Sequence, residues 1–244
     1  MATSGITIAQ LSRDDLINAA LRKLLVIGEG QSANATQLTT AAQALNNIVA
    51  EFRTLGMSLW ARKTYTLTLV NGQRDYVFGI GQPVNTAYPL RIYSAQVEQP
   101  PGYNIKIDMN QLSFTDFDKL PSDSGGIPVN FKYQPQVNKG IVSVWPIPDT
   151  SVLPLTRIVF QYQAPFEYFV SGLDTPDFPE EWNNALIYQL ALNLSDEFGK
   201  PLQNMTWLEK QAEKHLSTAL SAGQEETSFY ITPNSEGWDY PNQY

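Results

Sequence analysis

Thr-Tyr-Thr-Leu-Thr-Leu-Val-Asn-Gly-Gln-Arg-Asp-Tyr-Val-Phe, residues 64–78, is the stretch that decides the fold class. Polar and apolar side chains alternate along residues 64–69, which is the period of a strand with one buried face. Asn71-Gly72 then interrupts the alternation and is typical of a type I′ turn, because both residues tolerate a positive φ. A second short run, residues 74–78, follows directly. Together these features predict a β-hairpin.

Strand-like runs continue through the middle of the chain, and most of the prolines and many of the glycines lie between them. The further runs are residues 90–97, 104–109, 129–134, 140–145 and 156–164. One short helical turn is expected at residues 116–120. The section 60–172 is therefore predicted to be an antiparallel β-sandwich or barrel subdomain.

Apolar residues recur at helical spacing on both sides of that section. In residues 1–59 a first helix is expected to begin after Ser12 and to stop at Gly28-Glu29-Gly30, and a second to run from Asn34 to about Gly56. Residues 173–223 predict two more helices, with a break at 199–201. The fold class is therefore α+β: a four-helix bundle built from both sections, with the β subdomain inserted between them.

The last section, residues 224–244, has acidic residues, no Lys or Arg, and too many aromatic residues for an ordinary disordered tail. One interpretation is an extended C-terminal arm that becomes ordered on a neighbouring subunit or partner. The other is a strap that folds back over its own domain. The candidate partner-interface residues are Phe229, Tyr230, Ile231, Trp238, Tyr240 and Tyr244.

The composition of the chain argues against several classes of protein. The formal net charge of −8 argues against a protein that wraps nucleic acid, since such proteins use Lys and Arg to contact phosphates. The negative charge could either keep the chain soluble or let DNA slide past without sticking. With no cysteine and one histidine, His215, thiolate metal sites and cysteine nucleophiles are excluded. We expect no cofactor, no metal, no membrane span and no signal peptide, and therefore a protein made in the cytoplasm.

The enzymatic alternative is a cell-wall glycosidase, which needs only two suitably placed carboxylates. Candidates are Glu180, Glu181, Asp196 and Glu197. However, Glu180 and Glu181 stand where a helix begins and where its dipole favours acidic groups, and Asp196 and Glu197 lie near a helix end, where solvation explains them. No phosphate loop, dinucleotide fingerprint or nucleophile elbow is present. The sequence therefore assigns no catalytic residue.

Several motifs occur in a characteristic order. They are the helical stretches 16–25 and 41–59, Asn-Gly-Gln-Arg-Asp-Tyr at 71–76, Pro-Leu-Arg-Ile at 89–92, Val-Trp-Pro-Ile-Pro at 144–148 and Asp-Phe-Pro-Glu-Glu-Trp-Asn-Asn-Ala-Leu at 177–186. In order and spacing they resemble the head-to-tail adaptor proteins of short-tailed bacteriophages, the tail accessory or packaged-DNA stabilisation group.

The resemblance implies a structural protein in the neck of the virion. It implies a ring of twelve copies that binds beneath the portal protein, extends the DNA channel and offers a docking platform to the tail nozzle. Packaged DNA would pass through without sequence-specific binding. A tail or baseplate module that never contacts the portal is the structural alternative.

Overall fold

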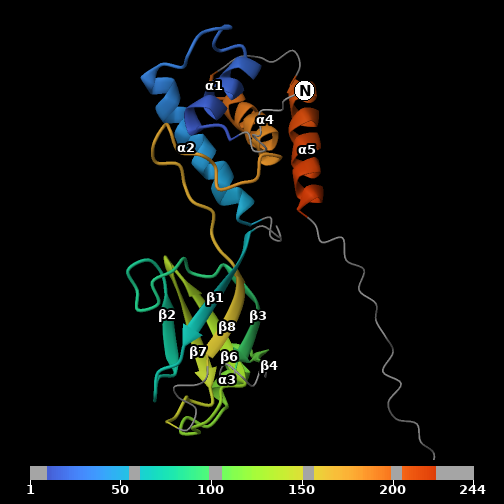
Figure 1. The fold of residues 1–244 in the computed structure, drawn as a ribbon. Helices are drawn as coiled ribbons and strands as arrows, with labels where there is room; N and C mark the ends of the chain where they lie inside the picture. The colour runs from blue at the N-terminus through green and yellow to red at the C-terminus, as the bar shows by residue number, and fades with distance from the viewer. Residues whose placement is uncertain (1–9, 55–60, 99–105, 151–156, 199–204, 224–244) are drawn as a thin grey trace, which may run out of the picture.

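The computed structural model describes residues 10–54, 61–98, 106–150, 157–198 and 205–223, and arranges them as a helical part and a β part that lie end to end (Figure 1). Helices from before and after the strands form the helical part, while the intervening segment forms the β part. Each part has its own hydrophobic cluster. The predicted α+β class is confirmed.

Two N-terminal helices begin where the sequence predicts. α1 spans Arg13–Lys23 and α2 spans Ala35–Phe52. The Ser12 hydroxyl accepts the Asp15 N–H and the Asp15 carboxylate accepts the Ser12 N–H, and Asn34 and Gln37 form the same reciprocal pair at the start of α2. Each pair satisfies two backbone donors that the first helical turn leaves free, which fixes where the helix begins.

α1 ends earlier than predicted. The expected stop at residues 28–30 is wrong, because the chain leaves the helix after Lys23. Val26 donates its N–H to the Leu21 carbonyl and Leu25 donates to the Arg22 carbonyl, which is the bonding pattern of a Schellman motif. Leu25 takes the left-handed position of that motif with φ +57°, a position where glycine is usual.

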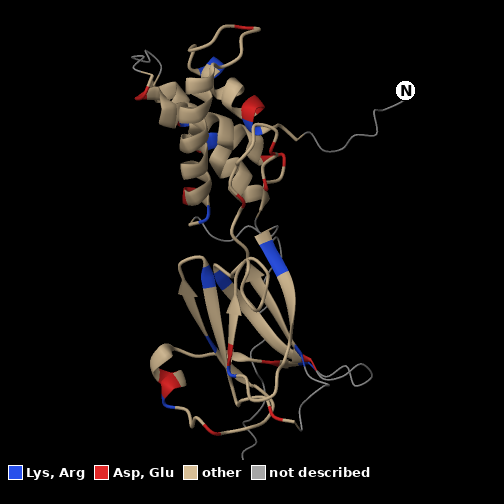
Figure 2. Cartoon of the chain, turned by 90° about the vertical axis from the view of Figure 1, so that its left-hand side faces the viewer, with Lys and Arg blue, Asp and Glu red and all other residues tan. Residues whose placement is uncertain are grey.

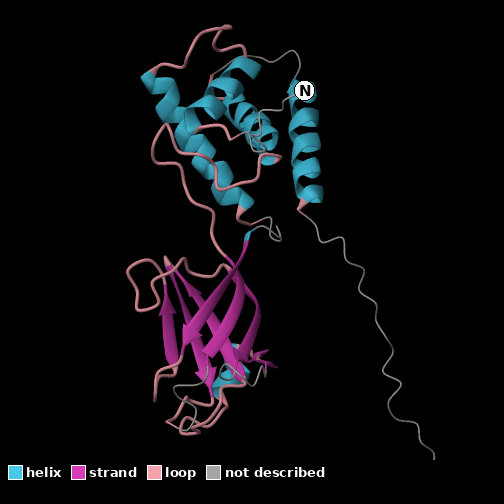
Figure 3. Ribbon diagram, in the orientation of Figure 1, coloured by secondary structure: helices cyan, strands magenta, loops and turns pink. Residues whose placement is uncertain are grey.

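α4 is the centre of the helical part (Figure 3). It spans Trp182–Ser195, buries nine of its 14 residues and contacts α1, α2 and α5. α5 spans Met205–Ala222, buries Leu208, Ala212 and Ala219, and packs chiefly on α4 within the described residues. α4 is largely apolar around its circumference and is therefore covered by several helices. α5 has one buried stripe and needs a single neighbour.

The strands form two four-stranded sheets, with neighbours in the orders β1-β8-β3-β4 and β2-β7-β6-β5. All pairs between these strands are antiparallel except the short parallel pair of β5 and β6, so the antiparallel prediction is wrong at that edge. The predicted short helical turn is α3, Phe114–Asp118. The strands are β1 Arg62–Thr68, β2 Asp75–Phe78, β3 Arg91–Glu98, β4 Lys106–Asp108, β5 Asn110–Gln111, β6 Asn130–Gln136, β7 Lys139–Trp145 and β8 Arg157–Gln163.

The predicted hairpin at residues 64–78 is wrong, although both of its strands exist. β1 pairs with β8 and β2 pairs with β7, so the Asn71-Gly72 turn carries the chain from one sheet to the other. Only Gly72 has a positive φ, +72°, and Gln73 donates its N–H to the Val70 carbonyl. A type I′ turn needs positive φ at both central residues, whereas this combination fits a type II turn.

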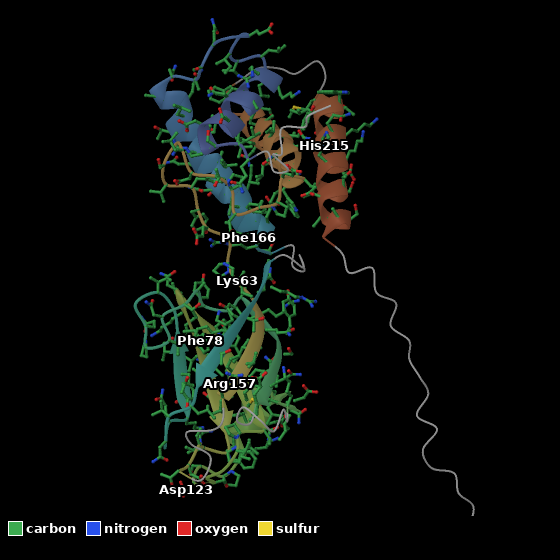
Figure 4. The ribbon with its side chains drawn as sticks, viewed as in Figure 1. Lys63, Phe78, Asp123, Arg157, Phe166 and His215 are labelled. Carbon is green, nitrogen blue, oxygen red and sulfur yellow. The ribbon has the colours of Figure 1, made fainter. Side chains whose placement is uncertain are left out.

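The β part has one interior shared by both sheets. Phe160 of β8 contacts Phe78 of β2 and Phe131 of β6, with ring centroids 5.9 and 6.0 Å apart. The two sheets therefore meet through their apolar faces, and the described strands do not close into a barrel. Figure 4 labels Phe78 inside this part.

The junction between the two parts belongs to the helical core. Ala61, Phe166 and Phe169 lie in the helical cluster although they flank β1 and β8. Phe166 packs against Phe178 with centroids 4.6 Å apart, and the Arg53 guanidinium donates to the Phe166 carbonyl. The chain that leaves the β part is thus anchored on the end of α2 (Figure 4).

Candidate functional site

A loop between β8 and α4 presents two apolar side chains to water. We call residues 167–177 the docking loop. Val170 and Leu173 are 87% and 86% exposed. Burying two such side chains on a partner would contribute about 1.5–3 kcal/mol each. A loop with two exposed aliphatic residues three positions apart is therefore a candidate contact surface.

The docking loop is held in place by hydrogen bonds to the start of α1. The Asp174 carboxylate accepts the N–H groups of Ser171 and Val170 at 2.6 and 2.7 Å, and these backbone bonds hold the pKa of Asp174 below its usual range. Arg13 donates its N–H to the Asp174 carbonyl at 2.8 Å, and Asp14 donates to the Gly172 carbonyl at 3.2 Å. These bonds fix the positions of Val170 and Leu173.

The surroundings of the docking loop are acidic. A cavity of about 790 Å³ is lined by the loop and contains Glu167, Asp174 and Asp177. Asp15 is exposed in the first turn of α1, to which the loop is bonded through Arg13 and Asp14. The guanidinium of Arg13 is already engaged, by the Asp14 carboxylate and by the Val170 carbonyl. Figure 2 shows acidic residues gathered on the side where the chain enters α1. This surface therefore pairs apolar side chains with negative charge.

A second cavity lies at the other end of α1, and we call it the basic cavity. It has a volume of about 680 Å³, and its lining includes Ala19, Arg22, Lys23, Glu29 and Ile187. Arg22 and Lys23 are exposed, and within the described ranges neither makes an ion pair. Ala19 and Ile187 are more covered and provide an apolar floor. Two cations suit the negative end of the helix dipole, and they also make this surface positive.

An aromatic cluster continues from the basic cavity to α5. The Lys23 ammonium lies 5.3 Å from the centroid of the Tyr188 ring, and the His215 ring stacks on Tyr188 at 4.8 Å. Trp207, which is 51% exposed, meets Tyr188 edge to face at 6.2 Å. Figure 4 shows His215 on α5. The histidine is thus packed against an aromatic ring.

The four candidate carboxylates of a glycosidase do not come together. Glu180 and Glu181 precede α4, whereas Asp196 and Glu197 follow it, and all four are exposed. A helix of 14 residues separates the two pairs by about 20 Å along its axis. Glycosidases need carboxyl groups about 5–10 Å apart across the scissile bond. Two pairs at opposite ends of α4 cannot act on one bond.

The described residues offer neither a metal site nor a membrane span. No group of three or more His, Asp or Glu residues could hold a metal ion there. None of the described helices combines the length and the apolar character needed to cross a bilayer.

The six aromatic and aliphatic residues predicted to contact a partner lie outside the described residues. Phe229, Tyr230, Ile231, Trp238, Tyr240 and Tyr244 all fall in 224–244. Sequence reasoning missed the docking loop and the basic cavity. The sequence does hold a signal for the docking loop. Asp174 follows Ser171 by three residues, a spacing that favours side-chain-capped turns, and Val170 and Leu173 lie in the same segment.

A family model described as SU10 adaptor protein matches residues 12–235. Among solved structures, the chain is similar to one described as the neck of an empty GTA particle computed with C6 symmetry. Sequence identity is 12% and the TM-score is 0.27, and the match covers 84% of this chain and 95% of that chain. No curated protein shows significant similarity to the chain.

Proposed function

Because the chain belongs to the SU10 adaptor protein family, we propose that it is a structural adaptor between the head and the tail of a phage or phage-like particle. The observation that carries this function is the family match over residues 12–235, which includes both the helical part and the β part. The adaptor acts by binding other protein subunits in the virion neck.

The finer proposal is a ring of twelve copies beneath the portal protein, with packaged DNA passing through its centre. In it, the four helices act as a bundle, residues 1–59 and 173–223, which contacts neighbouring copies and the portal. The inserted residues 60–172 act as a sandwich that projects outward or toward the tail. The end-to-end arrangement of two separate cores supports this division of contacts. The net charge of −8 suits a conduit that does not retain DNA.

Residues 224–244 act in this proposal as an extended arm on a neighbouring subunit or partner. Their composition supports that role, since aromatic side chains placed in partner pockets supply much of the binding energy of protein interfaces. Deletion of 224–244 is expected to weaken portal binding and to leave the melting temperature of the remaining chain unchanged. A truncated chain that binds the portal normally would remove the arm from the proposal.

A non-enzymatic role is part of the proposal. It is supported by the separation of Glu180 and Glu181 from Asp196 and Glu197 by the length of α4. Zymography of the purified chain on peptidoglycan tests it directly. Lysis that disappears when one of these carboxylates is replaced would overturn the structural role.

The experiment that tests the function mixes the purified chain with its portal protein and images the mixture by negative-stain electron microscopy. We expect added density at one face of the portal, and no such density when the portal is omitted. Antibody labelling of virions would place the protein at the neck. Label found at the distal tail or baseplate would favour the structural alternative and contradict the adaptor.

A further inference from the structure

We propose that the docking loop of one copy binds in the basic cavity of a second copy, which joins successive copies through opposite ends of α1. This inference rests on the proposed function, because it assigns the contact between copies in the ring. It is carried by the charges, the exposed side chains and the positions of two surfaces that the structure describes.

Charge complementarity is the first reason. The docking loop brings Glu167 and Asp177 to the surface, and both are exposed. The basic cavity brings Arg22 and Lys23 to its rim, where neither pairs with a carboxylate of the described chain. Opposite potentials steer association and set the register of an interface. The basic cavity thus carries two cations against one carboxylate, Glu29, whereas the charged residues lining the docking-loop cavity are all acidic, so the two surfaces have opposite net charge.

Apolar complementarity is the second reason. Val170 and Leu173 project from the docking loop, while the basic cavity has Ala19 and Ile187 among its lining residues. A cavity of about 680 Å³ has room for two aliphatic side chains and the turn that carries them. The loop needs no reordering on binding, because Asp174 already fixes Val170 and Ser171. Preorganisation of this kind reduces the entropic cost of association.

The positions of the two surfaces are the third reason. The docking loop is bonded to Arg13 and Asp14 at the start of α1, and the basic cavity includes Arg22 and Lys23 at its end. α1 has 11 residues, so the two surfaces are separated by about 16 Å of helix. A contact between two different surfaces is heterologous, and repetition of such a contact forms a ring when its rotation closes.

Disulfide cross-linking tests this contact, because the chain has no cysteine and any disulfide must come from introduced residues. Leu173→Cys places one thiol on the docking loop, and Glu29→Cys places one on the lining of the basic cavity without removing a cation. The two single variants are mixed with the portal protein and oxidised. We expect a covalent dimer that contains one chain of each variant, which can only be intermolecular. The double variant is expected to give a ladder of longer covalent chains.

The other outcomes would contradict either the proposed contact or the adaptor function. Dimers from Leu173→Cys alone would mean that two docking loops meet across a two-fold axis, which would overturn the proposed contact. Binding of both variants to the portal without any mixed dimer would also overturn it and would leave the adaptor function intact. Absence of portal binding by the unmodified chain would instead count against the adaptor function itself.

Charge reversal tests the same contact without cysteine chemistry. Arg22→Glu with Lys23→Glu is expected to lower the amount of chain assembled on the portal about tenfold, which corresponds to about 1.4 kcal/mol. Combining it with Glu167→Lys and Asp177→Lys should restore assembly. Lys63→Glu with Arg91→Glu is the matched control, because it changes the net charge equally at exposed positions of the β part. Equal loss in the control, or no rescue by the reciprocal charges, would contradict the pairing.

Discussion

The helical part and the β part differ in how their charged side chains are paired. In the β part, Glu98 accepts ion pairs from both Lys106 and Arg157, which hold the pKa of that carboxyl below its usual range, and Lys132 pairs with Asp118. In the helical part, Arg22 and Lys23 stand at one end of α1 and the acidic docking loop stands at the other. The β part thus pairs several of its charges locally. In the helical part Arg13 pairs with Asp14, but Arg22 and Lys23 lie at the other end of α1 from the acidic docking loop, where a second molecule can pair them.

The largest effect is expected from substitutions that test whether the two cores unfold independently. Phe160 is 1% exposed and joins the two sheets, and Leu186 is fully buried in α4. Phe160→Ala should lower the free energy of unfolding of the β part by about 3–5 kcal/mol, and Leu186→Ala should lower that of the helical part by about 2–5 kcal/mol. Hydrogen exchange read by mass spectrometry assigns each loss to its part. Equal deprotection of both parts by either variant would show that they unfold together.

A smaller effect is expected at Gly140 within the β part. The Tyr133 ring covers this glycine, and the Tyr133 hydroxyl donates to the Pro89 carbonyl. A methyl group at residue 140 would displace the ring, so Gly140→Ala should cost about 1–3 kcal/mol in urea unfolding. The same change in a Tyr133→Val background should cost less, because the smaller side chain leaves room. Additive costs would show that the ring is not the obstacle.

The sequence predicted the elements better than their connections. Alternation and turn residues located β3, β6, β7 and β8 within about two residues, and Ser12 and Asn34 marked two helix starts. Local signals of this kind depend on the residues themselves. The partners of β1 and β2 depend instead on β8 and β7, which follow much later in the chain, so Asn71-Gly72 could not reveal that the turn joins two sheets.

The candidate surfaces were less predictable still. Residues 170–174 and the start of α1 are more than 150 positions apart, and only the fold brings the Gly172 carbonyl to the Asp14 N–H. Similarly, Lys23 and His215 both meet the Tyr188 ring only because α1 and α5 both pack on α4. Composition indicated a binding protein, but long-range packing determines which residues share a surface.

The docking loop should respond to acid. The N–H bonds from Ser171 and Val170 lower the pKa of Asp174, so the carboxylate stabilises the loop at neutral pH, and this contribution is lost as the pH falls through the folded-state pKa, below about 4. Protection of the Val170 and Ser171 amides from hydrogen exchange should fall over that range. Asp174→Asn should show low protection throughout, whereas Asp177→Asn should behave like the parent chain. Protection that is independent of pH would show that other bonds hold the loop.

The smallest effect is expected at Leu25, where stability and assembly should move in opposite directions. Leu25 has φ +57° and is 76% exposed, and a left-handed residue with a side chain is strained. Leu25→Gly should therefore stabilise the free chain by about 0.5–1 kcal/mol in urea unfolding. If the end of α1 contacts a second copy, as the charge separation in the helical part indicates, the same substitution removes an apolar contact and should reduce the amount of chain assembled on the portal. A strained leucine at the surface is then retained for the contact it makes in the assembly, and improved assembly of the Leu25→Gly chain would contradict that explanation.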